Sequence, residues 1–408
     1  MRSLWLSAVA LAAATGVHAE PLTYPGALLK AQTTAPVLQA RTLQAEAARA
    51  AARPAAALPD PKLALGLDNF PISGPPAGRF GADEMTAARV GVMQDVPNRE
   101  KRRARGERAA ADVGAAVAAG TVDARQVRVQ TAVAWLDLYY GQQRLRALDD
   151  LLKSLAPLYA AAPSGVTSGA ARPGQALEPD QLRAELEDRR SELAAAIAKA
   201  RAQLARWTTI PAPEAAGQPP SLTVDPSALR QAIDSHPRLA AMNAATSQAE
   251  ADVKLARAEK RPDWGWEVAY QRRDRMFGDM VSAGVTVQLP LFAKSRQDPR
   301  IAAKVASAAA VRAEREAARR ELQADLEAAL ADHAMHHDQF LRARDTLLPL
   351  AKRRAELETA SYGAGRASLA DVVQAFHGLA NAQLTFLDRE AQTDIDAARI
   401  TLTYGSEQ

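Results

Sequence analysis

The chain has 408 residues, with 51 lysine and arginine residues against 47 aspartate and glutamate residues, so its net charge is only +4. Hydrophobic residues make up 48% of the chain and aromatic residues only 5%, which is typical of long, alanine-rich packed helices. This composition argues against a nucleic-acid-binding protein, because no basic stripe is interleaved with aromatic residues. Cysteine is absent, which excludes disulfides and catalytic thiols.

The N-terminus has the pattern of a secretory signal peptide. Arg2 supplies a positive charge, residues 4–14 are apolar, and a small-residue cleavage site follows. We expect cleavage after Ala19, so that residues 1–19 are removed and the mature chain is exported. The apolar segment is shorter than the roughly 20 residues of a membrane-spanning helix, and no later run reaches that length.

An internal repeat organises the rest of the chain. Gly, Asp and Ala recur at the same spacing in 174–184 and 365–375. A connector rich in Pro, Ala and Gly, at 211–226, separates the two copies. We therefore predict a first structural repeat over 20–210 and a second over 227–408. Each repeat is expected to form a helix, two strands, a long helix, a turn and a returning helix.

Two β-hairpins are predicted, at about 62–96 and about 263–290. From Trp264 to Tyr270, apolar residues alternate with small or polar ones, which is the period of a strand. Each strand has about nine residues, the length that a tilted strand needs to cross a bilayer. A half-buried strand of a soluble sandwich has the same alternation, but export and the Trp and Tyr side chains favour a membrane. Four strands cannot close a barrel, so they predict oligomerisation.

Two long helical hairpins are predicted, at about 99–207 and about 297–404. The first helix of each has about 60 residues and a length of about 90 Å, which suits a coiled coil or a helical tube. Pro157 and Pro349 are expected to mark kinks. The predicted fold is therefore mainly α, internally duplicated, with a small transmembrane β part.

Glycine-rich turns are expected to reverse the chain between the helices of each hairpin, because glycine tolerates positive φ. The residues of these two turns are Gly165, Gly169 and Gly174 in the first repeat and Tyr362, Gly363, Gly365 and Arg366 in the second.

The order of these motifs resembles that of TolC-type outer-membrane efflux proteins, over essentially all of the mature chain. The resemblance is carried by Pro59-Asp-Pro61, Gln94-Asp-Val-Pro-Asn-Arg-Glu-Lys101, Trp135-Leu-Asp-Leu138, Gln288-Leu-Pro-Leu-Phe292, Tyr362-Gly-Ala-Gly-Arg-Ala-Ser-Leu-Ala-Asp371 and Ala380-Asn-Ala-Gln-Leu384.

This resemblance implies a homotrimer with a 12-strand β-barrel in the cell outer membrane and a long periplasmic α-helical barrel. Such a channel is a passive exit duct without a cofactor, and it works with a periplasmic adaptor (membrane fusion protein) and an inner-membrane RND pump. The two turns would form the periplasmic tip that contacts the adaptor. Residues 70–74, 83–86 and 91–94 are similar to the heavy-metal resistance (CusC/CzcC-like) RND branch, which implies metal cations as cargo.

The resemblance also suggests a pore gate at Asp371 and Gln374, where the family often has acidic residues one turn apart. Gln374 is neutral, so this gate would carry less negative charge than is usual. A lone aspartate after a glycine turn is also an ordinary first-turn helix residue, favoured by the helix dipole. Both interpretations stay open for Asp371.

A histidine cluster at His333, His336 and His337 is the best candidate for a metal site, because these residues lie within one helical turn of each other. A polar patch on a long helix is the alternative. No phosphate-binding glycine loop, catalytic cysteine or His-Glu-x-x-His motif is present, so we do not expect an enzyme.

Other functions remain compatible with these patterns. The same fold serves multidrug efflux and type I secretion channels. A function of another class is that of a periplasmic coiled-coil scaffold protein, for which the strands would be soluble.

Overall fold

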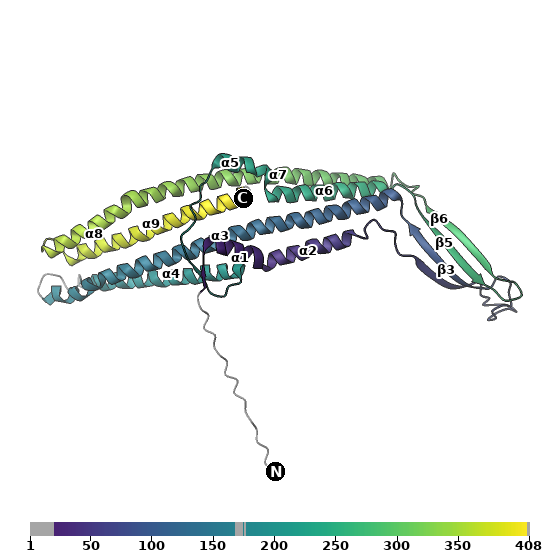
Figure 1. The fold of residues 1–408 in the computed structure, drawn as a ribbon, viewed down its shortest axis with the longest axis horizontal. Coiled ribbons are helices and arrows are strands. Elements are labelled where there is room, and N and C mark those ends of the chain that lie inside the picture. The colour runs from purple at the N-terminus through teal and green to yellow at the C-terminus, as the bar shows by residue number, and fades with distance from the viewer. Residues whose placement is uncertain (1–19, 168–173, 175–176, 406–408) are drawn as a thin grey trace, which may run out of the picture. The chain divides into compact units, whose positions relative to one another are not determined.

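The computed structural model describes residues 20–167, 174 and 177–405, and the predicted signal peptide at 1–19 lies outside them. The chain forms two compact units (Figure 1). Within the described residues, unit 1 holds 20–38, 123–233 and 323–405, and unit 2 holds 39–122 and 234–322.

The elements alternate between helices and strands in the same way in both halves of the chain. Those of the first half are β1 (Glu20–Leu22), α1 (Tyr24–Thr34), α2 (Pro36–Ala52), β2 (Lys62–Asp68), β3 (Ala87–Val96), α3 (Arg99–Thr167) and α4 (Glu178–Thr208). They are followed by β4 (Pro213–Ala215), α5 (Pro226–Ala232), a 3₁₀ turn (Ile233–Ser235), α6 (Pro237–Ala258), β5 (Asp263–Arg272), β6 (Met280–Gln288), α7 (Gln297–Arg342), a π-helical turn (Ala343–Leu347), α8 (Leu348–Gly363) and α9 (Leu369–Tyr404).

The core of unit 1 is centred on Trp135 of α3, which has no exposed surface. Its indole Nε1 donates a hydrogen bond of 2.7 Å to the Leu22 carbonyl, and Tyr24 meets the ring edge-on at 5.5 Å between centroids. Leu136 and Leu138 are also fully buried, which explains the Trp-Leu-Asp-Leu motif of the sequence. Truncating a leucine in such a site generally costs about 2–5 kcal/mol of the free energy of unfolding.

A two-stranded parallel pairing of β1 with β4 joins the start of the described chain to the connector. Backbone hydrogen bonds of 3.0 Å extend it at both ends, from the Glu20 N–H to the Ala212 carbonyl and from the Ala216 N–H to the Leu22 carbonyl. From the sequence, 211–226 is predicted only as a connector. Strands of three residues have no readable periodicity, so only the tertiary structure reveals this pairing.

The second core of unit 1 packs α3, α4 and α9 together. Its buried residues are Leu148, Leu151, Leu155, Leu182, Leu186, Leu193, Leu369, Val373, Ala380 and Leu384. Leucines recur every three or four residues on α3 and α4, which is the spacing of one helical face. This core fixes the first turns of α9, and with them the candidate gate residues.

The two prolines predicted to kink the long helices behave differently. Pro157 lies within α3, which is assigned as one helix of 69 residues. Pro349 follows the π-helical turn 343–347, where the Leu348 N–H bonds the Ala343 carbonyl, five residues back. Proline lacks an N–H and crowds the carbonyl four residues before it, and the wider π turn is one way to accommodate this.

Unit 2 contains α6 with the adjoining parts of α3 and α7, joined by ion pairs between helices. Asp252 of α6 binds Arg108 of α3 at 2.5 Å and Lys304 of α7 at 2.8 Å. Arg312 and Arg319 of α7 bind Glu250 and Asp234 at 2.6 and 2.8 Å. The charge-laced sequence of α7 therefore supplies interhelical pairs rather than a patch for an external polyanion.

Candidate channel surfaces and helical tip

The sheet of unit 2 has four antiparallel strands in the order β2-β3-β5-β6. Leu65, Val90, Tyr270 and Val281 lie opposite one another across the four strands, so they share one face. This face is exposed in the single chain although it is apolar. Its exposed members are Leu63, Leu65, Leu67, Val90, Val92, Trp264, Trp266, Val268, Tyr270, Val281, Val285 and Val287. Soluble monomers rarely expose so large an apolar patch, so another apolar phase or partner is expected to cover it.

The opposite face of the sheet is built from small and charged residues. Gly91 and Ala269 are neighbours in the register, and a Cβ on Gly91 would come within 3.0 Å of the Ala269 Cβ. Arg89 and Glu267, which lie on the same face on either side of this pair, form an ion pair across it. The two faces therefore differ in the way expected for a sheet between an apolar phase and water.

Both outer strands of the sheet have one edge without a strand partner among the described residues. β2 pairs only with β3, and β6 pairs only with β5. Every residue of β6 from Met280 to Gln288 is exposed. An exposed strand of this length is a template for pairing with another chain.

A polar junction anchors the start of β5 to the start of α3. The Asn98 backbone N–H and side-chain amide donate to Asp263 Oδ1 at 2.8 and 2.9 Å, and Lys101 Nζ donates to its Oδ2 at 2.6 Å. The junction explains the Pro-Asn-Arg-Glu-Lys motif after β3, because Asn98 and Lys101 are its two donors.

The tip of the second repeat is the turn between α8 and α9. Gly365 has φ +72°, a conformation that glycine adopts without strain. Its N–H bonds the Tyr362 carbonyl at 2.9 Å, and the Arg366 N–H bonds the Ser361 carbonyl at 2.8 Å. Gly363, Gly365 and Arg366 are exposed, whereas Tyr362 packs against the leucine core below the turn. Gly363, Gly365 and Arg366 are therefore the residues of this turn that are accessible to a partner.

Asp371 is part of the N-terminal cap of α9. The Asp371 N–H donates to Ser368 Oγ at 3.2 Å, and its carboxylate accepts from the Ser368 N–H at 2.9 Å, which forms a capping box. The side-chain hydrogen bond from Ser368 lowers the pKa of Asp371, so this carboxylate is ionised at neutral pH. Asp371 and Gln374 are both exposed, while Val372, Val373 and Ala375 face the core. The candidate gate residues thus lie one turn apart on the solvent face at the start of α9.

The turn of the first repeat differs from the sequence prediction. We expected the helix to end before Gly165, but α3 remains helical to Thr167. A glycine inside a helix costs only about 1 kcal/mol relative to alanine, which does not suffice to end a long helix. Gly169 lies outside the described residues. Gly174 is described and exposed, and a Cβ there would meet no atom within 4 Å.

The three histidines of α7 do not come together as a metal site. His336 Nδ1 lies 2.6 Å from Asp396 Oδ2 of α9. His333 and His337 lie with their ring centroids 6.3 Å apart, and burial lowers the pKa of His333. Over the described ranges, no group of three or more His, Asp or Glu side chains is placed to hold a metal ion. His336 therefore serves as a contact between α7 and α9.

A cluster of carboxylates on α9 lies beside this contact. The Tyr140 hydroxyl of α3 donates to Asp394 Oδ2 at 2.5 Å. Burial raises the pKa of Asp394, although the Tyr140 hydrogen bond lowers it in part. Burial also raises the pKa of Glu390, with a further contribution from the charge of Asp394. The sequence did not indicate this arrangement, because the burial of these carboxylates and the bond to Tyr140 depend on the packing of α3 against α9.

None of the helices in the described part of the chain combines the length and the apolar composition that a membrane-crossing helix needs.

Comparison with known proteins shows a family match in the second half of the chain and a shared fold over most of it. The family model for outer membrane efflux proteins matches residues 228–406. No curated protein sequence matches the chain. A membrane protein from Pseudomonas aeruginosa is 18% identical with a TM-score of 0.81, over 94% of this chain and 90% of that one. CusC, in a structural study of its folding and transmembrane channel formation, is 15% identical with a TM-score of 0.77, over 94% and 92%.

The outer membrane channel MtrE of Neisseria gonorrhoeae has the same fold, with 17% identity and a TM-score of 0.76 over 94% of this chain and 88% of that one. The second half of the chain is therefore similar to the outer membrane efflux proteins, and the chain as a whole has the fold of these solved channel structures.

We predict that Asp394→Asn makes the protein more stable at neutral pH, by about 1 kcal/mol in the free energy of unfolding. An asparagine oxygen still accepts the Tyr140 hydrogen bond, and the neutral amide removes the cost of burying a charge beside Glu390. The pKa of Asp394 is higher in the folded than in the unfolded protein, where it is about 3.8. The protonated side chain therefore contributes fully to the stability of the fold below pH 3.8, and this contribution is lost as the pH rises through the folded-state pKa. The difference between the two proteins should therefore grow from pH 4 to pH 7.

Urea unfolding followed by circular dichroism measures this difference. Asp388→Asn is the matched control on α9, because Asp388 binds Arg144 at 2.7 Å and its removal loses an ion pair. That variant should gain no stability. A destabilised Asp394→Asn protein at pH 7 would show that the Asp394 charge is favourable in the fold.

Proposed function

We propose that this chain forms a homotrimer whose sheets join edge to edge into a 12-strand barrel in the outer membrane. The observation that carries the proposal is the sheet with one apolar exposed face and two unpaired edges. Backbone N–H and C=O groups in lipid must be paired, and a closed barrel is the only sheet that pairs all of them. Pairing β6 of one copy with β2 of the next would satisfy both edges at once.

In this assembly the apolar face, from Leu63 on β2 to Val287 on β6, lies against lipid. Trp264 and Trp266 lie at the start of β5, where their rings suit the membrane–water interface. The charged face, with Arg89 and Glu267, lines the water-filled lumen. A periplasmic coiled-coil scaffold would leave the apolar face in water, which makes that alternative unfavourable by the hydrophobic effect.

Engineered disulfides test the trimer directly, because the natural chain has no cysteine. Three double variants combine Leu65→Cys on β2 with one cysteine on β6, at Ala283, Val285 or Val287. We expect one of the three pairs to form disulfides between copies and so to link them into a covalent trimer. The readout is a ladder of dimer and trimer on a non-reducing gel of membranes.

Val90→Cys, in place of Leu65→Cys, is the control for this experiment. β3 is already paired on both sides, so its cysteine should link to no second copy. Absence of a ladder for all three β2–β6 pairs would argue against the edge-to-edge barrel.

The trimer is proposed to act as a passive exit duct for heavy-metal cations delivered by an RND pump through a periplasmic adaptor. The sequence patterns of residues 70–74 and 91–94, which resemble the CusC/CzcC-like branch, support this cargo, and the fold shared with CusC is in keeping with it. MtrE shares the fold to the same extent, so cargo is the part of the proposal that most needs a test. The exposed turn residues from Gly363 to Arg366, with Gly174 of the first repeat, are proposed to contact the adaptor.

A deletion strain is expected to lose tolerance to one or more of copper, silver, cobalt, zinc and cadmium, because the pumped cation has no exit from the periplasm. Minimum inhibitory concentrations over a panel of metals and drugs measure this. Restored tolerance with the plasmid-borne gene is the control. Unchanged metal tolerance together with new drug sensitivity would assign the duct to multidrug efflux, and a loss of protein export would assign it to type I secretion.

We also propose that Asp371 contributes a ring of three negative charges to the closed end of the pore, with Gln374 beside it. Both side chains are exposed in the first two turns of α9, and the Asp371 carboxylate is ionised. A ring of carboxylates attracts cations and slows their passage when it holds them.

Asp371→Asn is therefore expected to weaken the block of the single-channel current by divalent cations in planar bilayers, and Gln374→Asp to strengthen it. Ser368→Ala separates charge from structure, because it removes the cap, at about 1 kcal/mol, and keeps the carboxylate. Asp180→Asn, at the corresponding helix start of the first repeat, should leave the block unchanged. An equal block in Asp371→Asn and the natural protein would exclude Asp371 from the gate.

A further inference from the structure

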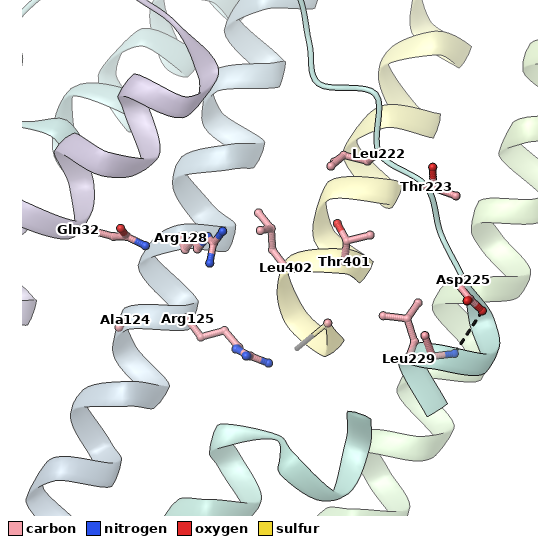
Figure 2. Close-up of a pocket in the computed structure, with 12 residues that line it drawn as sticks. Gln32, Ala124, Arg125, Arg128, Leu222, Thr223, Asp225, Leu229, Thr401 and Leu402 are labelled. Atoms are coloured by element: carbon pink, nitrogen blue, oxygen red, sulfur yellow. Dashed lines mark hydrogen bonds between the residues drawn. The ribbon is translucent and has the colours of Figure 1, made fainter. Parts of the chain in front are cut away.

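A cavity of about 410 Å³ lies in unit 1, away from the sheet and from the turns described above. It is enclosed by α1, α3, α5, the segment before α5 and the end of α9 (Figure 2). Its lining residues are Gln32, Ala124, Arg125, Arg128, Leu222, Thr223, Asp225, Ala228, Leu229, Thr401, Leu402 and Gly405. Nothing in the proposed duct uses this cavity.

Two arginines, one helical turn apart on α3, give the cavity its charge. Arg125 is already engaged, because its Nη1 donates to the Thr403 carbonyl at 2.8 Å at the end of α9. The single carboxylate of the lining, Asp225, is also engaged. Its Oδ1 accepts from the Ser227 N–H and hydroxyl, both at 2.8 Å, as the N-cap of α5. These are bonds to neutral groups, so the lining keeps a net charge of +1 from two arginines and one carboxylate.

The Nε of Arg128 is buried and has no hydrogen-bond partner among the residues that the structure describes. A guanidinium is always charged and carries five N–H donors, so burying one of them unpaired is costly. The buried Tyr24 hydroxyl has no partner in the described chain either. Burial raises the pKa of Tyr24 to about 12, although the charge of Arg128 lowers it in part, so the hydroxyl keeps its proton.

The rest of the lining has an apolar part, formed chiefly by Leu222, Leu229 and Leu402, and a neutral polar side chain, Gln32. Thr223 and Thr401 add neutral hydroxyls. An inorganic anion would pair with the arginine but leave these leucines in contact with water. A ligand with an anionic head and a compact apolar body satisfies both parts of the lining.

We propose that this cavity binds a small organic monocarboxylate, with its carboxylate on Arg128 and its apolar body against Leu222, Leu229 and Leu402. Such a ligand would contact α3, from the first half of the chain, and α5 and α9, from the second. Its binding would therefore hold these helices together and raise the stability of the folded protein with ligand concentration. The site is independent of which cargo the duct exports.

The test uses the full mature chain in a non-ionic detergent and 4-fluorobenzoate as the probe, followed by ¹⁹F relaxation and by thermal unfolding. We expect saturable broadening of the probe signal and an increase in unfolding temperature. The neutral isostere 4-fluorobenzamide should produce neither effect. Detergent micelles without protein give the background for both compounds.

Arg128→Gln should weaken binding of 4-fluorobenzoate about tenfold or more, because a hydrogen-bonded charge pair is lost. Arg146→Gln is the matched control, since Arg146 lies on the same helix, is exposed and is not part of the lining. It should leave the affinity within about twofold of the natural value, as surface substitutions usually do. Thr223→Glu, at the exposed rim, offers Arg128 a tethered carboxylate and should also weaken binding about tenfold.

The proposal is overturned if the natural chain does not bind 4-fluorobenzoate, or if the amide binds equally well. It is also overturned if binding survives in Arg128→Gln, or, should that variant fail to fold, in Thr223→Glu. Circular dichroism of each variant shows whether it has folded.

Discussion

The hydrogen-bonding groups along the free edges of β2 and β6 impose the strongest constraint on this protein. The described sheet has four strands, and a sheet of four strands leaves two edges. In water such edges can be solvated, but the apolar face beside them is unfavourable there. In lipid the apolar face is well solvated, but the unpaired backbone groups of the two edges are unfavourable. Association of several copies would satisfy both, so the proposed oligomer, membrane location and channel function all depend on the same few backbone groups.

The motifs that carry the family resemblance have identifiable physical roles in the fold. Trp135 organises a core and donates a hydrogen bond to the backbone of β1. Asn98 and Lys101 hold Asp263, and with it the start of β5. Ser368 and Asp371 cap α9. These residues stabilise the junctions between elements, where helix and strand propensities alone do not determine the path of the chain.

Sequence patterns alone indicated the helices and strands, because both have strong periodicities. The alternation from Trp264 to Tyr270 places every second residue on one face, whatever the rest of the fold does. Conversely, the sequence suggested that the first long helix ends before Gly165, and the helix continues to Thr167. Boundaries are hard to predict because the cost of one glycine is small beside the packing of a long helix.

Contacts between segments that are distant in the chain could not be predicted from the sequence. The histidine spacing on α7 suggested a metal site, but His336 instead meets Asp396, a residue 60 positions away. The pairing of β1 with β4, the Tyr140–Asp394 hydrogen bond and the cavity around Arg128 likewise join residues far apart in the chain. The sequence by itself determined the long helices, the two-faced strands and the family resemblance, since these depend on local periodicity and motif order. Only the tertiary structure decided which polar side chains meet, because that depends on how the helices are packed together.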